Sequence, residues 1–167
     1  MAAEKEEKKI YGVYNNNVFT KKIILSMNEV GKNLKQNLEI KLSSVSEGKC
    51  IPEGYIKQGS IKILTYSSGN VLNGNIEFQT VYECMVCYPV EGQLVECKTK
   101  AITKAGIHAE VIDSDGNVPI VIFVARDYHF TNKEFADVKE GDKLLVSIIG
   151  ISYNLNDDYI TATASLR

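Results

Sequence analysis

The sequence predicts an α+β unit followed by an all-β barrel of five strands. Residues 18–25 read as a strand and precede an apolar repeat at helical spacing, whereas the second half contains only short runs with strand-like alternation. Between the two halves, Pro89 and Gly92 interrupt the strand pattern. We therefore expect a flexible, solvated tail at residues 1–9, an α+β domain at 10–89 and a β-barrel domain at 90–167.

The first half is expected to pack one amphipathic helix against a sheet. Ser26 and Glu29 have the spacing of a capping box, which predicts that the helix begins at Ser26. A stripe at helical spacing is more often core than a partner groove. Further strands are expected at 54–58, 60–66, 71–72 and 76–88, with turn clusters between them. The apolar stripe consists of Val30, Leu34, Leu38, Leu42 and Val45.

The second half is expected to consist almost entirely of strands. Five segments have strand character, at 94–100, 107–113, 118–124, 142–152 and 159–164. Residues 113–117 predict a hairpin turn, and the polar stretch 126–141 predicts an irregular link with at most a short helical turn. Five short strands with the longer link between the third and fourth are typical of an OB barrel.

Composition and charge narrow the class of protein. With 44% apolar and 24% charged residues, the chain has the composition of a soluble globular protein. The charged N-terminus lacks the apolar run of a secretory signal. Residues 1–89 carry 11 Lys and 9 acids, whereas residues 90–167 carry 8 bases and 12 acids. Because nucleic-acid binders usually present a basic face, we expect any RNA binding to be modest and salt-sensitive, or to depend on a larger partner.

The cysteines are expected to be structural thiols. Cys84 and Cys87 form one C-x-x-C inside an apolar strand, where positions i and i+3 point to opposite faces. Cys50 and Cys97 add no second pair, and a structural zinc site needs about four ligands. We therefore expect no metal and no cofactor, and reduced thiols in a cytosolic or nuclear protein.

The sequence also lacks the usual signatures of an enzyme. It has two histidines, no Gly-rich phosphate loop, no G-x-S-x-G, and no acid pair beyond Asp157-Asp158 in a turn. We expect a protein without catalytic residues.

Two sets of residues resemble a known family. Gly92, Val95, Thr99, Ile102, Gly106 and the run 138–146 fill the framework positions of an S1-type OB domain. In the first half, the tags 47–50, 54–56, 69–72 and 82–92 occur in the order seen in the stalk subunit of multisubunit RNA polymerases. This family comprises the seventh subunit of RNA polymerase II and its archaeal counterpart, and the resemblance covers residues 10–167.

The resemblance implies a fold and a role. It implies an RNP-like N-terminal domain that docks on the polymerase core and its largest subunits, and a barrel that contacts nascent single-stranded RNA near the exit path. It also implies a small helical stalk partner of the fourth-subunit type, no catalytic activity and no membrane. A cellular eukaryotic homologue would be nuclear, and a viral or archaeal one would act in the cytoplasm or virion. Because the sequence departs from the family pattern and is rich in Asn, Ile and Lys, a homologue from a large DNA virus is also an expected possibility.

The RNA-binding candidates follow from the barrel half of the resemblance. S1 domains stack bases on rings at three positions, which here hold Ala105, His108 and Val124, so only His108 keeps a ring. Cations on the strands could contact phosphates or could form an ordinary solvated face. The cluster after the third strand could contact bases, or could serve as a barrel plug or partner interface, which we favour. The candidates are Lys98, Lys100, Lys104, His108, Arg126, Tyr128 and His129.

The docking candidates lie in the turn-rich segments of the first half. We expect residues 66–75 and the preceding segment 51–54 to form one tip that attaches to the core, although ordinary hairpin loops would look the same. The candidates are Ile51, Pro52, Gly54, Ser67, Gly69, Asn70, Asn73 and Gly74. The alternative function is a free-standing OB-fold RNA-binding protein, such as a translation or RNA-processing factor, which should show a basic face and several exposed rings.

Overall fold

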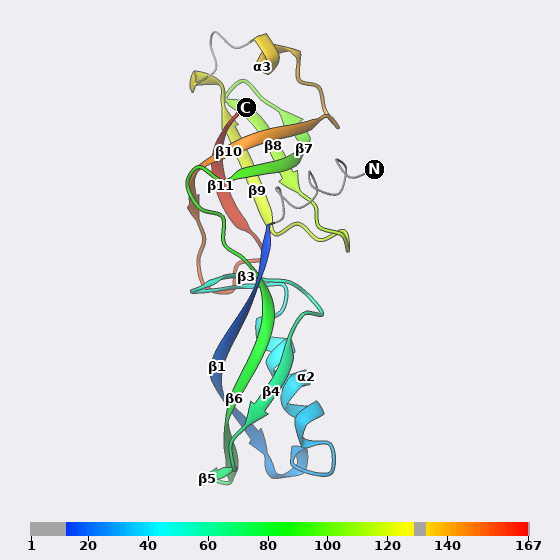
Figure 1. The fold of residues 1–167 in the computed structure, drawn as a ribbon, viewed down its shortest axis with the longest axis vertical. Helices are drawn as coiled ribbons and strands as arrows, with labels where there is room; N and C mark the ends of the chain where they lie inside the picture. The colour runs from blue at the N-terminus through cyan, green and yellow to red at the C-terminus, as the bar shows by residue number, and fades with distance from the viewer. Residues whose placement is uncertain (1–12, 129–132, 167) are drawn as a thin grey trace, which may run out of the picture.

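Two β structures lie end to end along the long axis of the molecule (Figure 1). The computed structural model describes residues 13–128 and 133–166. A six-stranded sheet with a helix on it is built from residues 14–87, and a closed five-stranded barrel from residues 94–166. The α+β unit and the barrel predicted from the sequence are therefore both present.

The first sheet is organised around one long antiparallel pair. Strand β1 (Tyr14–Ser26) pairs with β6 (Asn75–Cys87) along their full 13 residues, from Tyr14 opposite Cys87 to Ser26 opposite Asn75. The other edge of β6 pairs in turn with three short strands, β3 (Gly54–Ile56), β4 (Lys62–Tyr66) and β5 (Asn70–Leu72). Strand β2 (Cys50–Ile51) extends the sheet beyond β3. The long pair gives this half its elongated shape.

The helix begins later than the sequence predicted. The capping box of Ser26 and Glu29 is present, but it starts a single 3-10 turn, η1 (Met27–Glu29). The helix α2 (Leu34–Ser46) begins only after Gly31-Lys32-Asn33. Glycine and asparagine favour non-helical backbone, so the helical repeat does not run through this segment. The prediction of one continuous helix from Ser26 was wrong.

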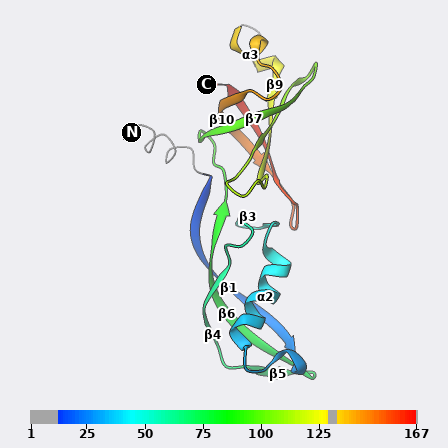
Figure 2. The ribbon, with the colours of Figure 1, turned by 90° about the vertical axis from the view of Figure 1, so that its right-hand side faces the viewer.

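Helix α2 covers one face of the first sheet (Figure 2). It buries Leu38, Leu42 and Ser46, which are four residues apart, whereas Val45 is 44% exposed and does not belong to the stripe. Spacing of four residues keeps side chains on one side of a helix. Leu38 and Leu42 pack into a core with side chains of the sheet, including Ile63, Phe78 and Tyr82.

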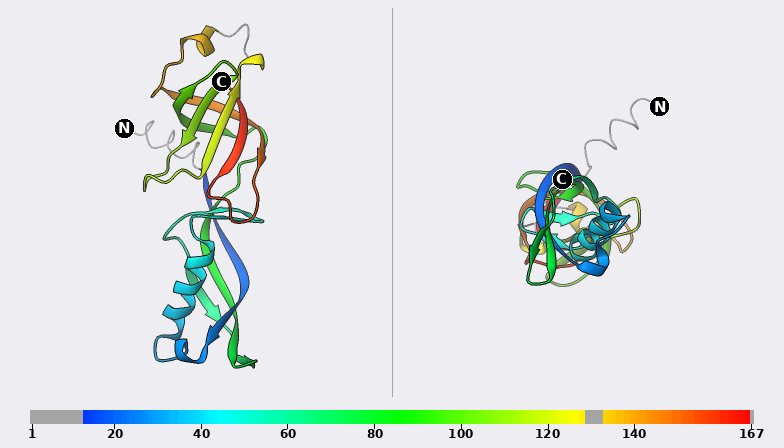
Figure 3. Two further views of the ribbon diagram at one scale, coloured as in Figure 1. Left: turned by 180° about the vertical axis from the view of Figure 1, so that it is seen from behind. Right: turned by 90° about the horizontal axis from the view of Figure 1, so that it is seen from below.

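The barrel has the five strands predicted from the sequence. Its strands are β7 (Leu94–Ile102), β8 (Gly106–Val111), β9 (Ile120–Ala125), β10 (Lys143–Ser152) and β11 (Ile160–Leu166). They close in the order β10-β11-β9-β8-β7, and β11 runs parallel to β9, which lies beside it in Figure 3. This OB-like order leaves no free edge. Alternate residues fill the interior, among them Val95, Ile107, Ile122 and Val146.

The link between the third and fourth barrel strands contains two short helical pieces. These are η2 (Arg126–Tyr128) and α3 (Lys133–Asp137), separated by residues outside the described part of the chain. Phe135 of α3 is buried in the barrel core, and the guanidinium carbon of Arg126 lies 5.3 Å from the centroid of its ring. The link therefore contributes a core side chain, as a barrel plug would.

The two halves are joined by main-chain hydrogen bonds on one side. The Cys50 amide donates to the Asp157 carbonyl and the Asn156 amide donates to the Cys50 carbonyl, each at 2.8 Å. The Tyr153 hydroxyl donates to the Pro52 carbonyl at 2.7 Å. The connecting segment 88–93 runs past this contact with Tyr88 against Tyr153, their ring centroids 6.3 Å apart. These contacts involve β2 and the loop before β11.

Side chains join the two halves at a second place. The Tyr14 hydroxyl donates to Asp113 Oδ2 at 2.8 Å, and Lys57 Nζ lies 3.6 Å from Asp115 Oδ2 in the same hairpin turn. The predicted turn at 113–117 is present, closed by the Asp113 amide donating to the Asn117 carbonyl. In addition, Cys50, Tyr55 and Cys87 of the first sheet pack within the barrel core.

Candidate nucleic-acid interface and docking surface

The outer side of β7 carries an alternating row of charged residues. Glu96, Lys98 and Lys100 are exposed, and the residues between them are buried, which confirms the predicted alternation. A register irregularity between Thr99 and Ala101 places Lys100 at a bulge. The two predicted lysines therefore lie on the solvent side of the barrel.

Acidic neighbours neutralise much of this positive charge. Lys100 Nζ lies 2.8 Å from Glu110 Oε1 on β8, and this hydrogen bond raises the pKa of Lys100. Lys143 Nζ on β10 lies 4.0 Å from Glu96 Oε1. Lys98 is in register with Glu110 on one side and Lys143 on the other. The face thus carries mixed charge, consistent with the acidic balance of this half.

Two rings lie side by side on the outer side of β8 and β9. His108 is opposite Phe123 in the strand pairing, and their ring centroids are 5.1 Å apart with planes inclined by 48°. Both rings are partly exposed. The corresponding two strands of OB barrels carry the face that binds oligonucleotides.

Phe123 was missed by the sequence analysis. The third ring position was assigned to Val124, but Val124 is fully buried and its neighbour Phe123 points outward. A one-residue slip moves every side chain of a strand to the other face. The alternation of Ile120, Ile122 and Val124 as core residues was the signal that could have identified Phe123.

The remaining RNA-binding candidates differ in their surroundings: Arg126 is held by main-chain contacts, whereas Lys104 is exposed. Arg126 donates to two main-chain carbonyls, from Nε to Lys104 at 3.0 Å and from Nη2 to Thr103 at 3.1 Å. With Phe135 beneath its guanidinium, Arg126 braces the end of the barrel. Lys104 is exposed in the turn between β7 and β8. The side chain of Tyr128 and the whole of His129 lie outside the described residues.

Five docking candidates lie at the end of the molecule opposite the barrel. Strand β5 and the turn into β6 form this end, and the turn uses positive φ at Asn73 (49°) and Gly74 (81°). Gly69 is close-packed, since a Cβ there would lie 2.5 Å from Ile76 Cγ2. The five are Ser67, Gly69, Asn70, Asn73 and Gly74.

Large apolar side chains are exposed at this same end. Val71 is 66% exposed and Leu72 is 44% exposed on β5. β5 and the end of β1 flank the same end of β6, and Ile24 at the end of β1 is 51% exposed. Met27, in the turn that follows, is 59% exposed. We call Ile24, Met27, Val71 and Leu72 the tip patch. These exposed apolar side chains gather at one end of the sheet, where the strand register places Ile24 and Val71 on opposite faces.

The remaining docking candidates lie at the joint and not at the tip. Ile51 and Pro52 come directly after Cys50, whose main chain contacts the barrel half. Gly54 starts β3, and the next residue of β3, Tyr55, packs in the barrel core. Gly54 has φ +135°, and a Cβ there would lie 2.5 Å from the Cys87 carbonyl oxygen. The prediction that residues 51–54 and 66–75 form one tip was wrong, because β3 and β5 pair with opposite ends of β6.

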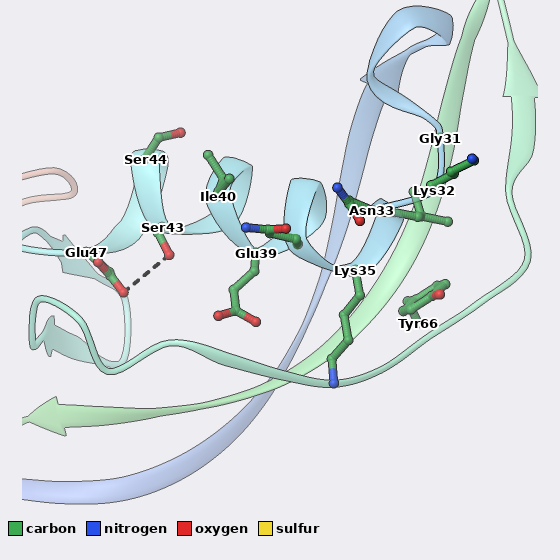
Figure 4. Close-up of a pocket in the computed structure, with 12 residues that line it drawn as sticks. Gly31, Lys32, Asn33, Lys35, Glu39, Ile40, Ser43, Ser44, Glu47 and Tyr66 are labelled. Carbon is green, nitrogen blue, oxygen red and sulfur yellow. Dashed lines mark hydrogen bonds between the residues drawn. The ribbon is translucent and has the colours of Figure 1, made fainter.

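A shallow depression runs along the exposed side of α2 (Figure 4). Lys32, Lys35, Glu39 and Glu47 line it together with Tyr66 of β4. Because cations and carboxylates alternate around it, the depression presents no consistent charge to a ligand.

All four cysteines are buried, and they divide between the two cores. Cys84 packs in the core beneath α2, whereas Cys50, Cys87 and Cys97 pack in the barrel core. Burial raises the pKa of Cys87 and Cys97 to about 12, and that of Cys50 and Cys84 to about 11. Among the described residues, no group of three His, Cys, Asp or Glu is placed to hold a metal ion.

Two known proteins are similar to this chain. A protein of Acanthamoeba polyphaga mimivirus, whose name assigns it provisionally to the DNA-directed RNA polymerase subunits, is 28% identical over 149 residues. DNA-directed RNA polymerase II subunit 7 of Arabidopsis thaliana is 30% identical over 107 residues. The chain is therefore similar in sequence to polymerase subunits of a virus and a plant.

The match to each relative is partial in length. The alignment with the mimivirus protein covers 80% of this chain and 69% of the relative. The alignment with the plant subunit covers 63% of the chain and 57% of the relative. No protein-family model matches the chain. Within the described ranges, none of the helices is both long and apolar enough to cross a membrane.

Proposed function

We propose that this protein is a non-catalytic subunit of a DNA-directed RNA polymerase and forms a stalk on the enzyme. The observation that carries the proposal is the similarity to two polymerase subunits, one of them along 80% of the chain. The order of a helix-covered sheet followed by an OB-like barrel supports it. In this proposal the first half is an RNP-like docking domain, residues 10–89, and the second an S1-type domain, residues 90–167.

The tip patch is the proposed contact with the polymerase core. Its apolar side chains are exposed at the end farthest from the barrel, where burial against a partner would remove them from water (Figure 1). The turn residues Asn73 and Gly74 shape this end, and the apolar side chains would supply most of the binding energy.

The ring pair is the proposed contact with nascent RNA. Stacking on His108 and Phe123 would hold bases without reading their sequence, at about 1–3 kcal/mol per base. Lys98, exposed on the neighbouring strand, would contact phosphate. Sequence-independent binding suits a protein that meets every transcript of its polymerase.

A small helical stalk partner is proposed to bind across the joint. Tyr88 and Tyr153 form an edge-to-face pair there, and Val90 (54% exposed) and Leu155 (64% exposed) flank it on the connecting segment and the loop before β11. Aromatic residues are enriched in the buried cores of interfaces. Because the pair draws on both halves, one partner could bind both at once.

Two measurements test the proposed function. Affinity purification of the full chain should recover large polymerase subunits and a small helical protein, identified by mass spectrometry. A double Val71→Asp, Leu72→Asp variant should lose the core but keep the helical protein, with Ile40→Asp on α2 as the control. A chain that purifies alone as a monomer and binds RNA tightly at about 200 mM salt would instead be a free-standing RNA-binding protein.

RNA contact is tested separately from assembly. Photo-crosslinking within purified elongation complexes should join transcript to β8 or β9 in the wild type. Lys98→Glu with Lys100→Glu should weaken the crosslink without releasing the subunit. An unchanged crosslink would place the RNA elsewhere on the protein. The compartment of the protein would follow that of its polymerase, nuclear in a eukaryotic cell and cytoplasm or virion for a virus.

A further inference from the structure

The ring pair lies directly beside the ion pair of Lys100 and Glu110. His108 and Glu110 are two residues apart on β8, so their side chains leave the strand on the same side. Glu110 is opposite Val121 on β9, and Phe123 is the next outward residue of that strand. A base stacked on His108 would therefore bring its phosphates close to this ion pair.

We propose that Glu110 attenuates RNA binding by occupying Lys100, so that transcript is held by stacking and slides freely. This inference rests on the proposed RNA contact and adds a device that sets its strength. Glu110 is a positioning residue, because it acts on RNA through Lys100.

The geometry makes Glu110 the fixed member of the pair. Its side chain is 21% exposed whereas that of Lys100 is 69% exposed, so the mobile lysine is held by an acid anchored against the barrel wall. At 2.8 Å the contact is a charge-assisted hydrogen bond, the stronger class of hydrogen bond. A phosphate must compete with this bond in order to use Lys100.

The same neutralisation recurs on the neighbouring strands. Lys143 lies 4.0 Å from Glu96, and only Lys98 is without a paired acid among the cations of this face in the described part of the chain. Each phosphate contact on single-stranded nucleic acid adds about 0.7 to the salt slope of log K. For the wild-type protein, the plot of log K against log salt concentration should therefore have a slope of about −0.7, as expected for a single phosphate contact by Lys98. Weak phosphate contact and sequence-independent stacking together permit a moving strand.

The test is RNA binding by Glu110→Gln in the full chain. The probe is a fluorescein-labelled single-stranded RNA of about ten nucleotides, within the site size of one OB barrel. Releasing one cation at roughly 6 Å from a phosphate in water should tighten binding about threefold at low salt. The salt slope should steepen by about 0.7. Adding Lys100→Gln to Glu110→Gln should restore the wild-type affinity and slope.

A matched control exists in the first sheet. Lys22 and Glu77 form a similar pair, with exposures of 70% and 24% against 69% and 21% for Lys100 and Glu110. Glu77→Gln changes net charge equally but lies far from the rings, so it should leave affinity and slope unchanged. If both glutamine variants tighten binding alike, bulk charge is responsible and the inference is overturned.

Separate results distinguish this inference from the RNA face itself. His108→Ala and Phe123→Ala should weaken binding if the face is correct. If they do so while Glu110→Gln changes neither affinity nor slope, attenuation is wrong and the RNA face stands. If neither alanine variant weakens binding, the RNA face itself is wrong. Lys100→Gln alone leaves the Glu110 carboxylate uncompensated and should cost up to about threefold in affinity, whereas a larger loss would show that Lys100 is already free for RNA.

Discussion

Replacing Tyr14 with phenylalanine should loosen the contact between the first strand and the barrel. The Tyr14 hydroxyl donates to Asp113 Oδ2 at 2.8 Å in a partly buried position. Hydrogen bonds to a charged group contribute about 1.5–3 kcal/mol. Asp113 Oδ1 keeps the amides of Asp115 and Asn117, both at 2.9 Å, so the carboxylate would not be left without donors. We therefore expect a loss near the lower limit, about 1.5 kcal/mol, and a fall in Tm of about 3–6 °C.

The loss should depend on pH in a defined direction. Burial, and then the hydrogen bond to Asp113, raise the pKa of Tyr14 well above its ordinary value of 10.0. A group whose pKa rises on folding contributes stability below its unfolded pKa and loses it as pH rises further. The stability difference between wild type and Tyr14→Phe should thus be constant at neutral pH and shrink above pH 10.0.

Chemical denaturation of the full chain, monitored by circular dichroism, measures this effect. The control is Tyr153→Phe, which removes a neutral hydrogen bond to the Pro52 carbonyl at an exposed position on the other side of the joint. It should cost about 0.5 kcal/mol. Equal stability of Tyr14→Phe and wild type, or a larger loss for Tyr153→Phe, would refute the view that the partly buried Tyr14–Asp113 contact dominates the side-chain part of the joint.

Three further predictions concern the two cores. Gly54→Ala should destabilise the protein by about 2 kcal/mol or more, because φ is +135° and the new Cβ would meet the Cys87 carbonyl; a neutral result in urea would mean that β3 shifts freely. Leu38→Ala should cost about 2–5 kcal/mol, because Leu38 is fully buried, whereas Ile40→Ala at 60% exposure should change stability by no more than about 0.5 kcal/mol. Iodoacetamide at neutral pH should leave Cys87 and Cys97 unmodified in the native protein, because burial raises both thiol pKa values to about 12. Rapid alkylation seen by mass spectrometry would show that the barrel core opens.

The barrel could be predicted because each of its strands and turns is specified by residues that are close together in the sequence. Each strand alternates core and solvent residues, and the turn at 113–117 has its own signature, so element type and order follow from sequence. The break before Leu34 was missed because a capping box indicates where a helix can begin but not how far it continues.

The candidate site was only partly predictable because it depends on pairing between strands. Sequence placed Lys98, Lys100 and His108 on the outer side of the barrel, which requires only alternation. The contact of Lys100 with Glu110 requires the register of β7 on β8, including a bulge that no short pattern reveals. The position of Phe123 beside His108 likewise depends on how β8 pairs with β9.

The joint at Cys50 has a consequence for how such a protein can change over evolutionary time. Its two 2.8 Å bonds connect main-chain atoms, so they require a fixed backbone path at positions 50, 156 and 157. The residues themselves are also constrained, because Cys50 is fully buried, Asn156 has a φ of 68° and Asp157 Oδ2 accepts from the Asn154 amide at 2.7 Å. Insertion or deletion of one residue in the loop before β11 would also be disruptive. Both the length of this loop and the residues at these positions are thus properties that selection should preserve at this point of the chain.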